Sequence, residues 1–309
     1  MRIGIDLGGT NIAGGLVTDD GRLVFKKSIP TRIESESILL SDIVAHIKTI
    51  ANEANGEEIS SVGIGVPGHA DDEAGLVVCC NNVPLNMTDL VGYVKRETGY
   101  ECHIGNDADA AALAEVRIGC AKDFNTAVMV TLGTGVGSGI IINNKIFTGC
   151  NGAAGELGHL CIDPEGLSCN CGRRGCFELY ASATALIRQT REAMKHHPGS
   201  LMWTLSGSLD DVSGRTAFDA MKKGDEIGKK VVDKFIRYLS IGIVDVINFM
   251  QPEAIILGGG ISKEGETLLA PLREITEKEC YSTYKKKTEF LIAELGNDAG
   301  IIGAAFFGD

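Results

Sequence analysis

Short runs of apolar and β-branched residues, separated by small polar turns, begin the chain. Residues 2–7 form the first run, and Ile12–Val17 and Leu23–Ser28 follow it after turns that contain glycine. Runs of this length between glycine, asparagine and aspartate are typical of β-strands, and the DDG sequence at 19–21 is typical of a hairpin turn. The pattern therefore predicts three consecutive strands in a meander.

Apolar residues then recur with the spacing of one helix face. Over Ile38–Ala54 they fall mostly three or four positions apart, which predicts a helix. A helix over Asp89–Thr98 is expected to stop at Gly99, and an alanine-rich helix is expected over Asp107–Ile118. Further helices are expected at about 179–197, 215–223, 226–250, 265–278 and 299–306, and further strands at 61–66, 254–257 and 290–294.

The opening pattern occurs a second time, about 125 residues later. Thr126–Thr131 and Val136–Ile142 are predicted strands on either side of a glycine turn, and Lys145–Phe147 is a third strand after a hairpin turn. Such an internal repeat indicates two related α/β domains that face each other. The polar segment 196–216 interrupts the later helices. We expect it to be a surface loop; the alternative is that it caps a cleft between the two domains.

The composition limits the class of protein. The 309 residues, 44% of them apolar, suffice for one or two α/β domains. A net charge of −12 argues against a nucleic-acid partner, whose phosphates require a basic surface. No apolar run reaches the roughly 20 residues that span a membrane, and the chain enters a strand at once, without a signal peptide. We therefore expect a cytoplasmic protein with no membrane partner and with reduced cysteines.

Three cysteines and a histidine form the most distinctive motif of the chain. Cys169, Cys171 and Cys176 follow His159 within the glycine-rich stretch 155–178. Three thiolates and one imidazole suit a tetrahedral Zn²⁺ ion, and four protein ligands with no open position are typical of a structural site. The spacing is tighter than that of a zinc finger. Chance clustering is the alternative in a protein with ten cysteines, but two intervening glycines supply turns that let the sulfurs converge.

Two glycine turns follow predicted strands at corresponding places in the two domains. The first, Asp6–Asn11 (DLGGTN), combines a carboxylate with exposed backbone N–H groups, which suits anionic oxygens and a hydrated metal ion. It is neither a P-loop nor a dinucleotide-binding turn. The second, Leu132–Gly137 (LGTGVG), is its counterpart. One such turn is compatible with a plain hairpin, whereas two matching turns predict a grip on a polyphosphate from both sides.

Two further motifs lie at strand ends. In the segment 105–110 (GNDADA), Asp107 and Asp109 stand at the start of the alanine-rich helix, where an aspartate commonly acts as a cap that contributes about 1 kcal/mol. The same position would also let Asp107 accept a proton from a substrate hydroxyl. The segment 63–68 (GIGVPG) is either a simple turn or one wall of a ligand pocket.

Six of these motifs resemble, in type and order, those of the ROK family of bacterial sugar kinases and repressors. They are DLGGTN, GVPG, NDADAAA, GTGVG, ExGH from Glu156 to His159, and CxCGxxGC with the trailing Glu178. The ATP-dependent glucokinases of the family are most similar. The resemblance implies an actin-like (ribonuclease H-like) ATPase fold, with two α/β domains around a cleft. It also implies a small domain of residues 1–118 and about 295–309, and a large domain of residues 119–294 that carries the zinc loop.

The resemblance assigns roles to single residues, with Asp107 as general base. The residues implied to bind the sugar are Gly68, Asn82, Asn106, Asp107, Glu156, His159 and Glu178. His159 is implied to share a structural Zn²⁺ with Cys169, Cys171 and Cys176. Asp6 is implied to hold Mg²⁺ through water. The residues implied to bind the ATP phosphates are Gly8, Gly9, Thr10, Asn11, Gly133, Thr134 and Gly135. Those implied to lie near the adenosine are Gly258, Gly259 and Gly260. Ser138 departs from the family pattern, because a glycine usually follows GTGVG.

The activity that the resemblance implies is phosphorylation of glucose at its 6-hydroxyl by ATP. The alternatives are N-acetylmannosamine kinase, N-acetylglucosamine kinase, fructokinase and allose kinase, which would differ in the pocket around the second carbon of the sugar. A repressor is disfavoured, because the chain is acidic and begins with a core strand instead of a helix-turn-helix segment. A sugar-binding protein without turnover is disfavoured by the presence of Asp107 and of both glycine turns. A homo-oligomer, either a dimer or a tetramer, is also expected from the resemblance.

Overall fold

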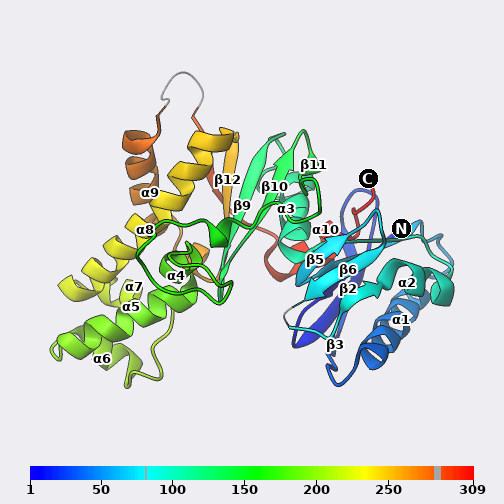
Figure 1. Ribbon diagram of the computed structural model, residues 1–309, viewed down its shortest axis with the longest axis horizontal. Helices are drawn as coiled ribbons and strands as arrows, with labels where there is room; N and C mark the ends of the chain where they lie inside the picture. Colours follow the sequence, from blue (N-terminus) through cyan, green and yellow to red (C-terminus); the bar gives the residue numbers. More distant parts are fainter. Residues whose placement is uncertain (81, 282–286) are drawn as a thin grey trace. The chain divides into compact units, whose positions relative to one another are not determined.

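Two compact units make up the chain (Figure 1). The computed structural model describes residues 1–80, 82–281 and 287–309. Unit 1 contains 1–129, 139–155 and 294–309, and unit 2 contains 130–138 and 156–293. The chain passes from one unit to the other within strands β9 (Ala127–Leu132) and β10 (Val136–Ile142), and again after residues 155 and 293. The predicted domain boundaries, with residues 1–118 and about 295–309 in a small domain and 119–294 in a large one, stay a prediction.

The first sheet has the strand order β3-β2-β1-β4-β8. Its antiparallel part is the predicted meander of β1 (Arg2–Leu7), β2 (Asn11–Val17) and β3 (Leu23–Pro30). Strands β4 (Ser61–Val66) and β8 (Cys102–Asn106) continue it in parallel to β1. The carboxyl ends of β1, β4 and β8 therefore meet at one edge of the sheet, which brings together the segments that follow them.

Helices cover both faces of this sheet. Ile5 on β1 and Ile50 on α1 (Glu36–Asn52) approach the same face of Gly14 on β2, so α1 packs against the face that carries Ile3, Ile5 and Leu7. Helix α2 (Leu90–Thr98) lies beside α1 (Figure 1), is capped by Asp89 and ends, as predicted, at Gly99 in the left-handed region. The opposite face packs against α3 (Asp107–Arg117) and α10 (Ala299–Ala304).

Glycines on the opposite face let α10 approach the sheet backbone closely. A Cβ atom on Gly4 would lie 1.8 Å from the carbonyl oxygen of Ile301, and one on Gly63 would lie 1.7 Å from that of Ala304. Gly4 and Gly63 are paired neighbours on β1 and β4. Any larger residue at these two positions would push the last helix away from the sheet.

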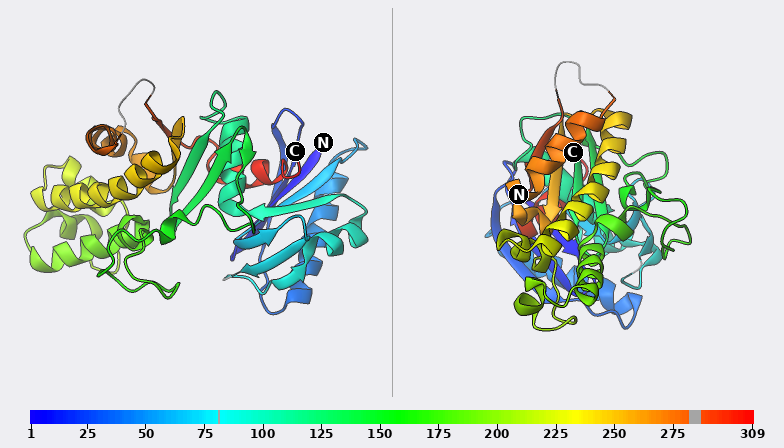
Figure 2. Two further views of the ribbon diagram at one scale, coloured as in Figure 1. Left: turned by 45° about the horizontal axis from the view of Figure 1, so that its top comes forward. Right: turned by 90° about the vertical axis from the view of Figure 1, so that its left-hand side faces the viewer.

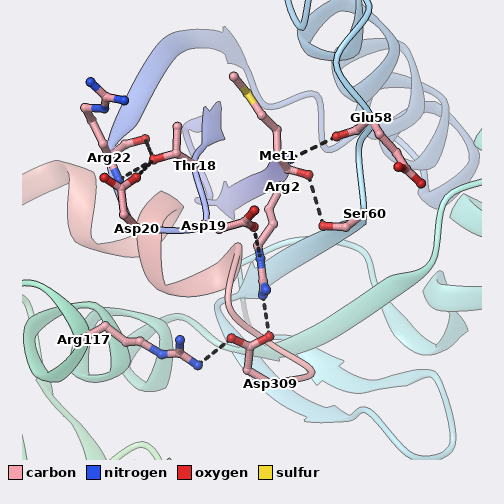
Figure 3. A network of polar contacts seen from close by, with 10 residues as sticks. All are labelled: Met1, Arg2, Thr18, Asp19, Asp20, Arg22, Glu58, Ser60, Arg117 and Asp309. Atoms are coloured by element: carbon pink, nitrogen blue, oxygen red, sulfur yellow. Dashed lines mark hydrogen bonds and ion pairs between the residues drawn. The ribbon is translucent and has the colours of Figure 1, made fainter.

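An ionic cluster holds the last residue of the chain against unit 1 (Figure 3). Arg2 donates to Asp309 Oδ1 at 2.5 Å, and Arg117 donates to Asp309 Oδ2 at 2.6 Å. Both guanidinium groups also stack on Phe306, at 5.0 and 4.6 Å from the ring centroid. The cluster therefore connects β1, α3 and the segment after α10.

A small antiparallel sheet of three strands was not predicted. It consists of β5 (Gly68–Asp71), β6 (Leu76–Cys80) and β7 (Asn86–Asp89), in the order β5-β6-β7. Its strands have four or five residues, and β5 and β7 are mostly polar or glycine, so no alternating pattern marks them.

The second sheet repeats the topology of the first. Its order is β11-β10-β9-β12-β13, with β11 (Lys145–Ile146), β12 (Ala254–Gly259) and β13 (Glu289–Ile292). As in the first sheet, three consecutive strands form one side, and a later pair of parallel strands completes the other. The internal repeat predicted from the strand and turn pattern is therefore confirmed.

Helices make up most of the rest of unit 2. The predicted helix at 179–197 is divided into α4 (Glu178–Ala181) and α5 (Ala183–His196), because Ser182 is extended and its hydroxyl caps α5. The longest helix, α8 (Glu226–Met250), has its predicted bounds and runs beside α9 (Glu266–Glu279), as Figure 2 shows. Unit 2 also contains α7 (Thr216–Lys222) and the short 3-10 helices η1 (Leu157–His159) and η2 (Ile261–Glu264). A third 3-10 helix, η3 (Gly296–Asp298), lies in unit 1.

The prediction of a surface loop at 196–216 was wrong in part. The segment contains α6 (Leu201–Ser206), whose Met202 is fully buried. Trp203 Nε1 donates to the carbonyl oxygen of Met194 on α5 at 3.0 Å, and Ser200 donates to Asp225 at 2.9 Å. These contacts fix the segment to α5 and to the start of α8. Among the described residues, no helix combines the length and the apolar character that crossing a bilayer would require.

Candidate active site

Unit 2 brings the four predicted metal ligands together. The ligand atoms of His159, Cys169, Cys171 and Cys176 all lie within 4.8 Å of one another. The loop that carries them folds back on itself, with backbone hydrogen bonds from Cys169 to Arg173 and from Gly172 to Cys169. Gly172 and Gly175 have positive φ angles of 87° and 69°, as expected for the turns between the cysteines.

The distances within this cluster fit a tetrahedral zinc site. Zn–S bonds of about 2.3 Å at tetrahedral angles separate two sulfurs by about 3.8 Å. The sulfurs of Cys171 and Cys176 are 3.6 Å apart, and that of Cys169 is 3.8 Å from His159 Nδ1. A disulfide would need a sulfur separation of about 2.05 Å, so these residues are free thiols.

A bound cation would change the protonation of the thiols. Burial raises the pKa of Cys169 and raises that of Cys176 to about 12, whereas the backbone N–H of Arg173 lowers the pKa of Cys171. Buried thiols of this kind become thiolates when a bound divalent ion compensates their charge. The donor set and its geometry therefore suit the predicted Zn²⁺.

Two predicted sugar-binding glutamates flank the cluster. Glu178 Oε1 lies 3.7 Å from His159 Nδ1 and accepts a hydrogen bond from Cys169 Sγ at 3.4 Å. Glu156 Oε2 lies 4.0 Å from His159 Nε2, on the other ring nitrogen. The imidazole thus has one nitrogen toward the thiols and the other toward Glu156. The side chain of Glu156 is 67% exposed and that of Glu178 is 24% exposed.

The ExGH segment is fixed to the strand that follows the second glycine turn. Leu157 N donates to Ser138 Oγ at 3.3 Å, and Ser138 is buried. A Cβ on Gly158 would lie 2.3 Å from the carbonyl oxygen of Val136, so only glycine allows this approach. The serine that departs from the family pattern is therefore a hydrogen-bonding partner of η1, a role that sequence reasoning missed.

The second glycine turn lies beside Glu178 and the GGG segment. A Cβ on Gly135 would lie 2.5 Å from Glu178 Oε2. Gly259, with a φ of 85°, approaches the backbone of Leu132, where a Cβ would meet the carbonyl oxygen at 2.4 Å. Unit 2 therefore brings together three predicted groups, the turn at 133–135, the segment 258–260 and the cysteine–histidine cluster. Thr134, in the middle of the turn, is exposed.

Unit 1 brings Asp6 and Asp107 close enough to interact electrostatically. Burial and, after it, the charge of Asp107 raise the pKa of Asp6 to about 6, while Lys26 opposes the shift. The Asp6 carboxylate abuts α10, because a Cβ on Gly300 would lie 2.7 Å from its Oδ2. Asp107 is exposed at the first residue of α3, and its Cα lies against Gly65 at the end of β4.

Asn106, not Asp107, is the N-cap of α3. Its Oδ1 accepts hydrogen bonds from the backbone of Ala108 at 2.8 Å and of Asp109 at 3.3 Å, while its Nδ2 donates to the Gly68 carbonyl oxygen at 3.1 Å. Asp107 Oδ1 accepts from Ala108 N at 2.8 Å. The capping role that was the alternative for Asp107 therefore belongs to Asn106. The predicted contact of Asn106 with the sugar stays a prediction.

The first glycine turn and Asn82 also lie together in unit 1. Gly8 N donates to the carbonyl oxygen of Asn11 at 2.9 Å, and Thr31 N donates to that of Thr10 at 2.9 Å. A Cβ on Gly9 would lie 3.2 Å from Cβ of Asn82. Gly9, Thr10, Asn11 and Asn82 are all exposed, so their polar groups are available to a ligand.

Cys80 is a further neighbour of Asp107 that sequence reasoning missed. Burial, together with the charges of Cys79 and Asp107, raises the pKa of its thiol to about 11. A Cβ on Gly68 would lie 2.9 Å from Cys80 Sγ. Because β6 was not predicted, no sequence signal placed Cys80 beside the GVPG turn.

Similarity to known proteins agrees with this arrangement of motifs. The model of the ROK family matches residues 2–308. The glucokinase of Thermotoga maritima is 38% identical over 305 residues, which cover 98% of this chain and 95% of the relative. This chain belongs to the ROK family.

Other ROK relatives include both kinases and repressors. One is a ROK family glucokinase from Streptomyces griseus, whose crystal structure is in complex with glucose and AMPPNP. Its sequence is 34% identical to this chain, and the two structures superpose with a TM-score of 0.81 over 98% of this chain and 97% of that chain. The xylose repressor of Bacillus spizizenii is 30% identical over 97% of this chain and 75% of its own length. The predicted actin-like fold, which the ROK glucokinases have, is confirmed.

Proposed function

We propose that the protein transfers the γ-phosphoryl group of ATP to the 6-hydroxyl of glucose. The near full-length similarity to the Thermotoga maritima glucokinase, and to the Streptomyces griseus glucokinase bound to glucose and AMPPNP, supports this reaction. The structural observation that carries it is the position of Asp107. This carboxylate is exposed at the start of α3, next to Asp6 and the end of β4, while Asn106 provides the helix cap.

Asp107 is the proposed general base. Its carboxylate accepts the proton of the 6-hydroxyl as that oxygen attacks the γ-phosphorus, and base catalysis of this kind contributes a factor of about 10²–10⁴. The proposed sugar ligands of unit 1 are Asn82, Asn106 and the Gly68 turn, whose backbone Asn106 holds. Those of unit 2 are Glu156, His159 and Glu178. Hydroxyl groups of a sugar need paired donors and acceptors, which a set of amide, imidazole and carboxylate groups provides.

The two glycine turns are the proposed phosphate-binding elements. Gly8–Asn11 and Gly133–Gly135 would contact the phosphates through backbone N–H groups and polar side chains, and Gly258–Gly260 would contact the adenosine. Asp6 would hold Mg²⁺ through water, and the ion supplies neutralisation of phosphate charge when it is bound. A buried carboxylate with a pKa of about 6 is well suited to gain a cationic partner at neutral pH.

Zn²⁺ is the proposed resident ion of the cysteine–histidine cluster. His159, Cys169, Cys171 and Cys176 would hold it, and when bound it supplies a rigid cross-link for the loop. Glu156 and Glu178 contact His159, so the cross-link fixes their orientation as well. The proposal thus joins a structural metal to the sugar-binding side chains.

A coupled phosphorylation assay with Mg–ATP tests the proposed reaction. Glucose should give the highest kcat/KM in a panel with mannose, fructose, allose, N-acetylglucosamine and N-acetylmannosamine. A clear preference for an acetylated amino sugar or for fructose would replace glucose by one of the alternative substrates, and no turnover with any sugar would favour a sensor of the repressor type. We further expect a homodimer or homotetramer, which light scattering behind size-exclusion chromatography measures directly.

A further inference from the structure

A second pocket lies in unit 2, and none of the proposed catalytic, sugar-binding, nucleotide-binding or metal-binding residues lines it. Its volume is about 930 Å³, and it lies between α5, α8 and the loop segment 163–174. Helices α5 and α8 contact each other and run through the same part of unit 2 (Figure 1). The proposed reaction leaves this pocket unexplained.

Four cationic side chains line the pocket without a carboxylate partner among the described residues. Arg174 donates to Ser168 Oγ at 3.1 Å, and Arg188 donates to the carbonyl oxygen of Leu179. Lys230 and Lys234 lie four residues apart on α8, where like charges repel each other. A concave site with unpaired cations favours anions, even in a protein whose net charge is −12.

Three carboxylates also line the pocket, Asp163, Glu165 and Glu192, and none of them forms an ion pair with these four cations among the described residues. Glu192 is engaged by His196 at 2.9 Å and by Lys195 at 3.5 Å. Asp163 accepts a hydrogen bond from the Tyr180 hydroxyl at 3.2 Å. With Glu192 paired to Lys195, the four cations exceed the remaining carboxylates, Asp163 and Glu165, by two charges, which a compact dianion such as a phosphate group would compensate.

The rest of the pocket suits a hydroxylated ring. Tyr180 and Tyr238 form an aromatic wall, with ring centroids 4.8 Å apart, and Lys234 lies 5.9 Å from the Tyr238 ring centroid. Gln189 donates from Nε2 to the Tyr180 carbonyl oxygen at 2.9 Å, and its buried Oε1 has no donor among the described residues. An aromatic wall, an amide acceptor and unpaired cations together match a sugar phosphate better than an apolar ligand or a bare metal ion.

We propose that this pocket is a binding site for a small phosphorylated sugar. The site has a direct connection to the cysteine–histidine cluster, because Arg174 lies between Cys171 and Cys176 in the chain and Ser168 precedes Cys169. A bound phosphate would therefore contact the loop whose far end carries Glu178. Ligand binding should alter the KM for the sugar substrate.

Titration calorimetry with glucose 6-phosphate on the full chain tests the site. The existence of the site does not depend on the proposed function, although the choice of this probe does, since it is the product of the proposed reaction. Titrations are run with and without saturating glucose, which blocks binding of the product at the catalytic site. Wild-type protein should bind one equivalent in the presence of glucose. The double variant Lys230→Gln/Lys234→Gln should lose at least tenfold in affinity while keeping its kcat.

The double variant Lys223→Gln/Lys229→Gln is the matched control. It removes the same charge from the same unit, but neither lysine lines the pocket, so its affinity should stay within twofold of wild type. Equal losses in both double variants, or no glucose-resistant binding, would overturn the proposal. Inorganic phosphate bound as tightly as the sugar ester would overturn its sugar part. An inactive protein that still binds the ester through Lys230 and Lys234 would refute the proposed function alone.

Discussion

Asn106 fastens the start of α3 to Gly68, because its Nδ2 donates to the glycine carbonyl oxygen at 3.1 Å while its Oδ1 caps the helix. Two separate segments, the end of β8 and the GVPG turn, are thereby held at a fixed distance. Asp107 is the next residue along the chain. The position of the proposed base therefore depends on the amide of its neighbour.

Replacing Asn106 should separate stability from catalysis. Asn106→Ala removes a cap and a hydrogen bond and should lower the free energy of unfolding by about 1–2 kcal/mol. It should also lower kcat by about tenfold, because Asp107 loses its support. Ser35→Ala is the control, since Ser35 caps α1 in the same way, through Ile38 N. Equal stability losses with equal kcat losses in both variants would contradict the positioning role.

Asp107→Asn should lower kcat by at least about 10², because an amide cannot accept the proton of the sugar hydroxyl. The variant is isosteric and Asn106 retains the helix cap, so the thermal midpoint should change little. Steady-state kinetics together with circular dichroism measures both effects. A variant with the turnover of the wild type would reduce Asp107 to a structural residue of the helix terminus.

The strands and helices with clear periodicity were predictable from the sequence. Strand β4 and helix α8 have their predicted bounds, since both are long or strongly apolar and end at distinct breakers. The strands β5–β7 were missed, because their pairing is long-range and their residues carry no alternation. The break at Ser182 and helix α6 were also missed, since a hydroxyl cap and a single buried Met202 decide them.

The candidate site was predictable where residue chemistry is distinctive. The residue types and the spacing of the three thiols and His159 are enough to predict a metal site. The capping by Asn106 and the contact between Ser138 and Leu157 could not be predicted, because each depends on which of several polar side chains reaches a backbone group. The proximity of Cys80 to Asp107 depends in turn on the unpredicted sheet.

Loss of one thiolate should remove the proposed metal. Wild-type protein should contain about one zinc per chain by plasma mass spectrometry, and Cys171→Ser should contain almost none. The thermal midpoint should fall, and the KM for glucose should rise by about tenfold, since His159 and Glu178 lose their anchor. Cys161→Ser is the control, because this exposed cysteine belongs to the same loop but not to the cluster. A zinc-free wild-type protein would exclude the structural ion.

Asp6→Asn should stabilise the protein at neutral pH while it impairs catalysis. The pKa of Asp6 is raised by burial, and then by Asp107, from 3.8 to about 6 in the folded state. The unfolded chain therefore releases this proton first, and stability decreases as the pH rises from about 4 to about 6 and stays reduced above it. Two pKa units correspond to about 3 kcal/mol, which is the largest gain expected for the amide at pH 7.5. At pH 5 the gain should be about half as large.

Urea unfolding of both proteins without Mg²⁺ or nucleotide measures this difference at the two pH values. The kcat of Asp6→Asn should fall at the same time, because the amide carries no charge for the hydrated ion. Residues that serve a bound ligand often destabilise the empty fold in this way. A gain in stability that does not change with pH would assign the effect to packing against Gly300. A loss of stability at pH 7.5 would show that the folded state favours the Asp6 carboxylate even without a metal ion.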